Sequence, residues 1–595
     1  MNLLQRVRSA SDPAIPQSLV EKIKSCALLE GVNERALHRV LAEAEWISLN
    51  GGVTLRRDGE NDAAIFVVLT GALGVLVSGD CGHETLVATI PAGETVGEMS
   101  LISGEEHSAT IVALRDSELM RIGKPLFDKL TARHPRVMMN LTRQLVRRLR
   151  HTTRRAAHHE RPKTFALVPL QPGLDCSALM RDLEAALRDL GKKTARLDIR
   201  NGEANADFFH GVETAHDTVV YEADAPDSVW ARQCLRQADR VVLIARAARA
   251  GLLKPVTAAH ALLTRQHPDL VILHENGRLQ PGATAKLLAE SGAHIHHHVR
   301  NGNRADIAKL ARYLTGQAVA LVLSGGGARG FAHLGVLRAL QEARIPVDLI
   351  GGASMGGIVA AGIAMEWSIE ELTARLKHCF VDTNPLDDYT FPVFALVRGR
   401  KVSQLLRDNF GDVAIEDLAC NFFCCSSSLT SGRSIAHRAG PVWRALRATV
   451  AIPGILPPVI DDGQMLVDGG LMNNFPVDLM AGFARGPIIG VDVTGDSGLT
   501  AKADLSEVPF WRGLRAGFGG TPNIVSILMR SGTVGNEIQR RQARAMADVL
   551  FEPALEGIGL RAFKAFDRAI EEGYRHTIEL IEKQNLPQSL RTIAA

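Results

Sequence analysis

A serine set between two glycines is the clearest sign of chemistry in this sequence. Gly352, Ser354 and Gly356 form a GxSxG pattern. In this pattern a sharp turn from a strand into a helix exposes the serine Oγ, and the glycines relieve crowding at the turn. The helix behind the serine also favours negative charge that develops at its N-terminus. Because the chain has 54 glycines, the pattern alone is a weak signal. The strand before it and the helix after it must show whether it is a nucleophile turn.

A glycine-rich loop precedes this serine. It follows the apolar run 319–323 and comprises Gly325, Gly326, Gly327, Ala328, Arg329 and Gly330. The loop fits GxGxxG, but no acidic residue ends a second strand at the distance that a dinucleotide site requires without colliding with the Ser354 turn. Beside a serine turn, successive backbone N–H groups instead predict an oxyanion hole for acyl transfer. A plain tight turn is the alternative.

The serine needs a base to accept its proton. Asp468, Gly469 and Gly470 directly follow the apolar run 465–467, and the only later histidine is His576, in a charged segment near the C-terminus. We therefore expect a Ser–Asp dyad and no histidine-containing triad. An aspartate has an ordinary pKa of about 3.9, so desolvation must raise that pKa for Asp468 to be an effective base.

The elements around these motifs predict a parallel sheet. The run 319–323 precedes the glycine loop, and a helix with Leu334, Leu337 and Leu340 on one face follows it. A second strand at 347–350 leads into Ser354 and then into an apolar helix at 358–365. Two adjacent strand–loop–helix units place both loops at the carboxyl edge of one sheet, where we expect the chemistry.

The three motifs occur in an order that resembles a known family. Gly325–Gly330, Gly352–Gly356 and Asp468–Gly470 resemble the oxyanion loop, nucleophile turn and catalytic aspartate of the patatin-like phospholipases. Trp230–Asp239 and Leu446–Pro458 are similar to the neuropathy target esterase branch, which extends the resemblance over most of the chain. It implies hydrolysis of lysophospholipid or phospholipid esters, with Ser354 as nucleophile, Asp468 as proton acceptor and no metal or other required cofactor.

The N-terminal part resembles a cyclic-nucleotide-binding domain. Short strands at 64–69, 72–77, 85–90 and 109–114 predict a small antiparallel roll. The resemblance rests on Gly59, Asp62, Gly71 and the stretch from Gly97 to Leu101, and implies a nucleotide site of Gly97, Glu98, His107, Ser108 and Thr110. Glu98 would bind the ribose, but His107 stands where an arginine should hold the phosphate. A neutral imidazole cannot replace that bidentate contact, so we favour a roll without ligand over a cyclic nucleotide as regulator.

The fold class is α/β, with four parts expected along the chain: a β-roll with flanking helices (1–155), a middle α/β domain (163–316), a three-layer patatin-like catalytic domain with a parallel-rich sheet (319–481) and a largely helical tail (482–595). In the middle domain, strands at 165–168, 240–244 and 270–273 alternate with helical patterns. It carries no phosphate-loop or dinucleotide motif, so we expect a scaffold or docking domain.

Composition limits the partners and the compartment. The net charge is only +3 over 595 residues, which gives no reason to expect nucleic-acid binding. Eight cysteines without a CxxC pair suit a reducing, cytoplasmic compartment. No apolar stretch is long enough for a membrane span. The arginines of 147–155 would suit a peripheral contact with an anionic membrane, or simply form the wet face of a helix. The oligomeric state is not predicted.

Several residues are expected to be structural. His294, His296, His297 and His298 cannot easily converge on one metal ion, so we expect a solvated loop and no metal site. His333 either orients the glycine loop or caps its helix, and Cys424 and Cys425 are expected as small buried groups in a strand.

Two other functions remain open from the sequence. One is a signalling scaffold in which the roll binds a nucleotide or partner and the esterase domain is vestigial. The other is transfer of the acyl group to an alcohol in place of water.

Overall fold

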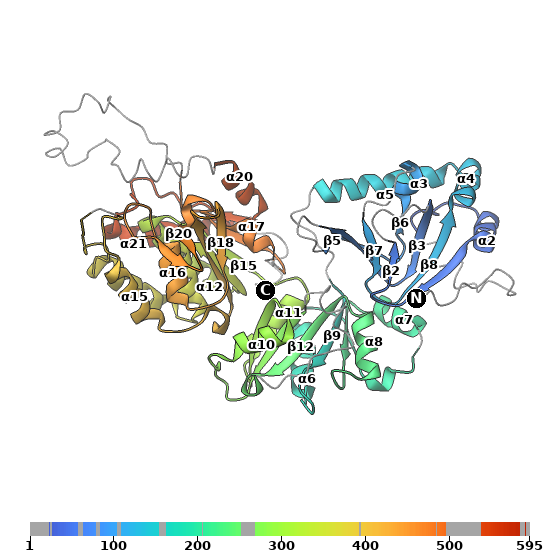
Figure 1. Cartoon of the computed structure of the whole chain (residues 1–595), viewed down its shortest axis with the longest axis horizontal. Helices are drawn as coiled ribbons and strands as arrows, with labels where there is room; N and C mark the ends of the chain where they lie inside the picture. The colour runs from blue at the N-terminus through green and yellow to red at the C-terminus, as the bar shows by residue number, and fades with distance from the viewer. Residues whose placement is uncertain are drawn as a thin grey trace, which may run out of the picture.

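The computed structural model describes residues 23, 26–56, 63–78, 84–103, 109–153, 162–204, 206–250, 268–391, 394–482, 485–495, 537–583 and 590. Three regions built around sheets follow one another along the chain, and the middle region lies between the other two (Figure 1). Within the described residues, no helix has both the length and the apolar character that crossing a bilayer demands.

The N-terminal region is a roll of two antiparallel sheets. Residues of β3 point alternately to two cores: Ile65, Val67 and Leu69 pack against the helices, whereas Phe66 and Val68 pack between the sheets. The expected roll is confirmed. One sheet has the strand order β1 (Glu45–Leu49), β8 (Ser117–Gly123), β3 (Ala64–Thr70) and β6 (Thr95–Val96). The other has the order β2 (Thr54–Arg56), β7 (Thr110–Ala113), β4 (Ala72–Ser78) and β5 (Glu84–Pro91). The helices are α2 (Glu34–Glu43), α3 (Glu98–Ser103), α4 (Lys124–Arg133) and α5 (Arg136–Thr153).

The middle region is a six-stranded parallel sheet with helices on both faces. One core includes Phe209, Trp230 and Leu287, and the other includes Leu183 and Leu310. The strands, in sheet order, are β10 (Thr194–Leu197), β11 (Thr218–Glu222), β9 (Thr164–Pro169), β12 (Arg240–Arg246), β13 (Asp269–His274) and β14 (Ile295–Arg300). The helices are α6 (Ser177–Asp189), α7 (Ala206–Ala215), α8 (Val229–Gln237), α10 (Ala283–Ser291) and α11 (Arg304–Leu314).

The expectation of a solvated histidine loop was wrong. His296, His297 and His298 are buried in β14, and only His294 lies exposed before the strand. His298 Nδ1 lies 2.9 Å from His274 Nε2, and His298 Nε2 lies 3.1 Å from the Glu416 carbonyl of the third region. The strand is covered by the neighbouring domain, a long-range contact that local composition does not reveal.

The third region is a mixed sheet of eight strands. The strand order is β19 (Val459–Asp461), β20 (Gln464–Asp468), β17 (Asn421–Ser428), β16 (Leu349–Ala353), β15 (Ala320–Leu323), β21 (Ile488–Val491) and β22 (Val549–Phe551), with β18 (Arg433–His437) paired to β17. Five neighbouring strands, β17, β16, β15, β21 and β22, are parallel to one another. The antiparallel pairs involve β18, β19 and β20. Cys424 and Cys425 are buried in β17, as expected.

Helices cover both faces of this sheet. Most contribute to one large core, whereas α17 and α20 pack on the other face. They are α12 (Ala332–Glu342), α13 (Met355–Ala364), α14 (Ile369–Lys377), α15 (Arg400–Phe410), α16 (Val442–Thr449), α17 (Val477–Ala481), α20 (Glu537–Met546) and α21 (Phe566–Glu582).

The segment after residue 481 is not only a helical tail. Strands β21 and β22 belong to the third sheet, and α21 crosses α12 at close range. A Cβ at Gly335 would lie 1.9 Å from the Ile570 carbonyl oxygen, and one at Gly573 would lie 2.1 Å from that of Ala332. The two glycines allow this crossing, so the C-terminal helix is part of the third region. The two strands are only four and three residues long, too short to stand out by periodicity.

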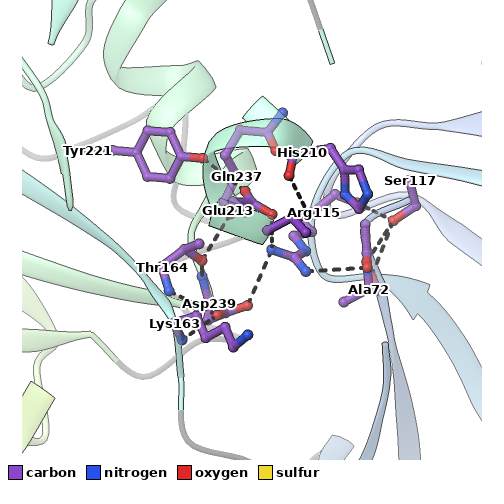
Figure 2. A network of polar contacts seen from close by, with 12 residues as sticks. Ala72, Arg115, Ser117, Lys163, Thr164, His210, Glu213, Tyr221, Gln237 and Asp239 are labelled. Carbon is purple, nitrogen blue, oxygen red and sulfur yellow. Dashed lines mark hydrogen bonds and ion pairs between the residues drawn. The ribbon is translucent and has the colours of Figure 1, made fainter. Parts of the chain in front are cut away.

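A polar cluster joins the roll to the middle region (Figure 2). From the turn between β7 and β8, Arg115 Nη1 reaches Glu213 Oε2 of α7 at 3.1 Å and Asp239 Oδ1 at 3.8 Å. In the same interface, Arg236 Nε donates to Asp116 Oδ1 over 3.1 Å. Arg236 belongs to the Trp230–Asp239 stretch, so that stretch forms part of a domain interface.

Candidate active site

Ser354 stands on a strained turn between β16 and α13. Its backbone φ of 50° and ψ of −124° lie in a region that non-glycine residues rarely adopt. The turn also presses against the end of β15: a Cβ at Gly356 would lie 2.3 Å from the Leu323 carbonyl oxygen, and one at Gly352 would lie 2.6 Å from it. The glycines of the GxSxG pattern are therefore required by close backbone packing.

Asp468 lies directly beside this serine. Ser354 Oγ donates to Asp468 Oδ2 over 2.8 Å, and Gly470 N donates to Asp468 Oδ1 over 2.7 Å. Asp468 is the last residue of β20 and is buried. Burial raises the pKa of this carboxyl to about 6, although the hydrogen bonds from Gly470 and Ser354 oppose the shift. The group can therefore be ionised at neutral pH and still be basic enough to accept a proton.

No histidine takes part in this pair among the residues that the structure describes. His333 is fully buried, and its Nε2 lies 2.9 Å from the Ser324 carbonyl oxygen, which supports the loop before Gly325. Burial lowers the His333 pKa to about 4, so the ring is neutral at pH 7. His576 Nε2 accepts a hydrogen bond from Glu552 N at 3.0 Å. Of the two roles expected for His333, the helix cap was favoured, but no described side chain caps α12 and the ring instead contacts the start of the glycine loop.

The glycine loop offers two backbone donors. Gly325 N donates to the Asn474 carbonyl and Ala328 N to that of Leu560, at 3.0 and 2.9 Å. The N–H groups of Gly326 and Gly327 have no hydrogen-bond acceptor within the described part of the chain, and both residues line the cavity at Ser354. Of the six residues in the predicted loop, these two have backbone N–H groups that could donate to a negatively charged oxygen in the cavity.

The remaining loop residues hold the loop in place. Gly327 has a φ of 54°, and a Cβ there would lie 2.3 Å from the Leu560 carbonyl oxygen. Arg329 Nε donates to the Ile558 carbonyl over 2.7 Å, and its Nη1 donates to the Thr494 carbonyl. A Cβ at Gly330 would collide with Met355. The segment around 558–560 thus supports the oxyanion loop from the part of the chain for which only a helical tail was expected.

Sequence reasoning missed two further side chains at the site. Thr449 Oγ1 accepts a hydrogen bond from Ser354 N at 2.8 Å, and Asn474 Nδ2 donates to the Gly325 carbonyl over 3.1 Å. Thr449 lies within the Leu446–Pro458 stretch that resembles the esterase branch, which was the one available signal for it. Asn474 follows shortly after the aspartate motif but has no motif of its own.

A largely apolar cavity of about 630 Å³ opens beside the pair. Ser354, Met355 and Ile358 line it along α13, and it extends to Trp367 beyond the end of that helix. Ten helical residues rise about 15 Å, so the cavity is long enough for an extended hydrocarbon chain. Further apolar lining comes from α14 and the turn after it, from α15, from the segment after α16 and from the C-terminal segment: Leu376, Phe380, Val402, Leu406, Phe410, Ile455 and Phe563.

The predicted nucleotide site is only partly described. Gly97, with a φ of 91°, precedes the buried Glu98 at the start of α3, and Thr110 begins β7. His107 and Ser108 lie outside the described residues, as do Gly59 and Asp62. Within the described chain, no group of three or more histidine, cysteine, aspartate or glutamate side chains is placed to hold a metal ion.

Three family models match consecutive parts of the chain. They are described as cyclic nucleotide-binding domain (46–134), Neuropathy Target Esterase family P-loop like domain (161–320) and patatin-like phospholipase (321–481). The segment after β9, residues 170–176, holds one glycine and no lysine. It therefore lacks a phosphate-loop motif, and the likeness to a P-loop is one of fold.

The similar proteins are larger than this chain. The lysophospholipase NTE1 of Yarrowia lipolytica is 28% identical over 76% of this chain and 39% of its own length. The neuropathy target esterase sws of Drosophila melanogaster is 29% identical over 77% of this chain and 37% of its own. Among solved structures, the Thermus thermophilus catabolite activator protein aligns with a TM-score of 0.21 and 25% identity, over 28% of this chain and 67% of that one.

The chain spans less than half the length of these two relatives. The middle and third regions thus match, one after the other, models described for the Neuropathy Target Esterase family and for patatin-like phospholipases, and the chain is similar to proteins of that branch.

Proposed function

We propose that this chain is a serine esterase that hydrolyses acyl esters of lysophospholipids and phospholipids. The observation that carries the proposal is the 2.8 Å contact between Ser354 Oγ and Asp468 Oδ2 beside a long apolar cavity. The cavity suits an acyl chain, and the buried carboxylate suits a base. The names of the relatives, lysophospholipase and neuropathy target esterase, support the same substrate class.

The proposed reaction has two halves. Asp468 accepts the Ser354 proton as Oγ attacks the ester carbonyl carbon, while the N–H groups of Gly326 and Gly327 donate to the oxyanion. The ester C–O bond then breaks, and the proton on Asp468 passes to the departing alcohol. In the second half a water molecule gives a proton to Asp468 and attacks the acyl-enzyme. The fatty acid leaves, and Ser354 recovers its proton.

The test is fatty-acid release from lysophosphatidylcholine by the purified chain. We expect Ser354→Ala and Asp468→Asn each to abolish release, and His576→Ala to retain it, because this last histidine lies outside the site. Activity in Ser354→Ala would refute the nucleophile, and loss in a folded His576→Ala protein would refute the dyad. Inactivity of the folded parent would favour the scaffold alternative. Added alcohol that yields a new ester would identify acyl transfer.

We further propose that the roll regulates the esterase through the interface in Figure 2. Arg115 and Arg236 link the turn after β7 to the middle region, which in turn contacts the catalytic unit through Arg300 and Glu366 at 2.7 Å. The test compares the parent with Arg115→Ala/Arg236→Ala, in the presence and absence of cyclic AMP or cyclic GMP. A change in kcat would support regulation. Unchanged kinetics together with no calorimetric binding of either nucleotide would leave the roll as a structural domain.

A further inference from the structure

A short loop projects from the catalytic region beside the cavity. Arg398 N donates to the Asp388 carbonyl over 2.9 Å and Thr390 N to the Leu396 carbonyl over 3.0 Å, so the two sides of the loop run antiparallel. Tyr389 and Val397 form a bridge across the same base. These contacts pair the two sides of the loop at its base.

The loop exposes large aromatic side chains. Tyr389 is 71% exposed, and Phe391 and Phe394 are each 84% exposed. Burial of a phenylalanine side chain is favourable, so three exposed aromatic residues within six positions are unusual for a surface that meets only water. Ala395 and Val397, which follow Phe394 in the sequence, are buried and fix this side of the loop to the domain.

The base of this loop belongs to the cavity wall. Leu396 N donates to the Gly454 carbonyl and Val397 N to the Ile455 carbonyl, at 2.9 and 3.0 Å. Ile455 lines the cavity at Ser354, as does Leu386 at the start of the loop. A lipid that contacts the aromatic tip is therefore close to the wall of the cavity that would receive its acyl chain.

Two cations lie at the edge of the aromatic cluster. Arg398 and Arg400 are exposed, and their guanidinium groups form no ion pair within the described residues. The neighbouring acidic groups are engaged: Asp387 pairs with Lys401 at 2.8 Å, and Asp388 Oδ2 accepts the N–H groups of Arg400 and Lys401. An apolar tip with a basic rim is complementary to an anionic bilayer, whose acyl chains accept the rings and whose phosphates attract arginines.

We propose that Phe391 and Phe394 form the membrane-docking element of this chain and insert into an anionic lipid surface, with Arg398 and Arg400 at its headgroups. This inference goes beyond the proposed hydrolysis and does not depend on it, because docking needs no reaction at Ser354.

The test is co-sedimentation of the full chain with vesicles, carried out in the Ser354→Ala background so that no lipid is consumed. Vesicles of phosphatidylcholine with and without phosphatidylglycerol are compared. We expect Phe391→Ser/Phe394→Ser to weaken binding to the anionic vesicles about tenfold or more. Arg398→Gln/Arg400→Gln should reduce the preference for phosphatidylglycerol and the sensitivity to salt. The matched control is Val229→Ser, which removes a 74% exposed apolar side chain from the middle region and should bind like its parent.

A second measurement separates docking from catalysis. With Ser354 restored, the two phenylalanine substitutions should leave hydrolysis of a dispersed short-chain ester unchanged and slow hydrolysis of vesicle-borne lysophospholipid. The proposal is overturned if the parent stays unbound at low salt, or if the phenylalanine variant binds as the parent does. It is also overturned if sedimentation velocity without lipid shows a parent dimer that these substitutions dissociate, because the loop would then be a self-association surface.

Discussion

The hydroxyl of Thr449 connects the backbone of Ser354 to the strand beside Asp468. Its Oγ1 accepts a hydrogen bond from Ser354 N at 2.8 Å and donates its own proton to the Cys425 carbonyl in β17. The next residue of β17, Ser426, is paired with Asp468 of β20. One buried hydroxyl therefore holds the nucleophile turn in register with the strand that carries the base.

Replacement of Thr449 should reduce turnover more than binding. Thr449→Val keeps the shape of the side chain but removes the acceptor for Ser354 N, and we expect kcat to fall about tenfold to a hundredfold with little change in KM. Thr449→Ser retains the hydroxyl and should recover most of the rate. Equal losses in the two variants would show that Thr449 acts through packing and not through this hydrogen bond.

The pH dependence of the reaction should report Asp468. Its pKa is raised to about 6 by burial, and only the ionised form can accept the Ser354 proton. We therefore expect kcat/KM to be level near pH 7 to 8 and to fall about tenfold for each pH unit well below 6. The measurement uses a dispersed ester at constant ionic strength. An acid limb centred near pH 4 would mean that the carboxylate is solvated in the working enzyme.

The same burial should lower stability at neutral pH. The pKa of Asp468 is raised above its ordinary value to about 6 in the folded chain. Above about pH 6 the carboxyl is ionised in both states, and folding must bury this charge, at a cost on the order of 1–3 kcal/mol. Asp468→Asn should remove this cost and raise the melting temperature at pH 7 but not at pH 4. Urea or thermal unfolding at the two pH values checks this. A variant less stable at pH 7 would contradict the expected sign.

Gly327 should tolerate no side chain, because both backbone conformation and space exclude one. Its φ is 54°, and a Cβ would lie 2.3 Å from the Leu560 carbonyl oxygen. We expect Gly327→Ala to displace the oxyanion loop and lower kcat about a hundredfold. Gly432 is the matched control, with a φ of 68° and nothing within 4 Å of a Cβ. Gly432→Ala should cost about 1 kcal/mol of stability and leave kcat unchanged.

Local sequence was sufficient to predict those parts of the site that are formed by one strand, the turn after it and the next helix. The runs before Gly325 and Ser354 predicted parallel strands, and these pair directly as β15 and β16. The contacts that sequence reasoning missed join distant segments: Ala328 with Leu560, Ser354 with Thr449, and Gly335 with Ile570. Such contacts depend on the tertiary fold, and neither periodicity nor motif spacing encodes them.

The histidines of β14 illustrate the same limit and give a last prediction. Desolvation lowers the pKa of His296 to about 3, and it also lowers the pKa values of His274 and His298. The unfolded chain then binds more protons than the folded one below about pH 6.5, so stability should decrease as the pH falls from there. His296, with a pKa of about 3, would account for about 1.4 kcal/mol of this loss of stability per pH unit. Urea unfolding at pH 7 and pH 5 should show a smaller loss for His296→Gln than for the parent, since the variant has one proton fewer to take up on unfolding. Equal losses in the two proteins would mean that His296 is protonated in the folded chain.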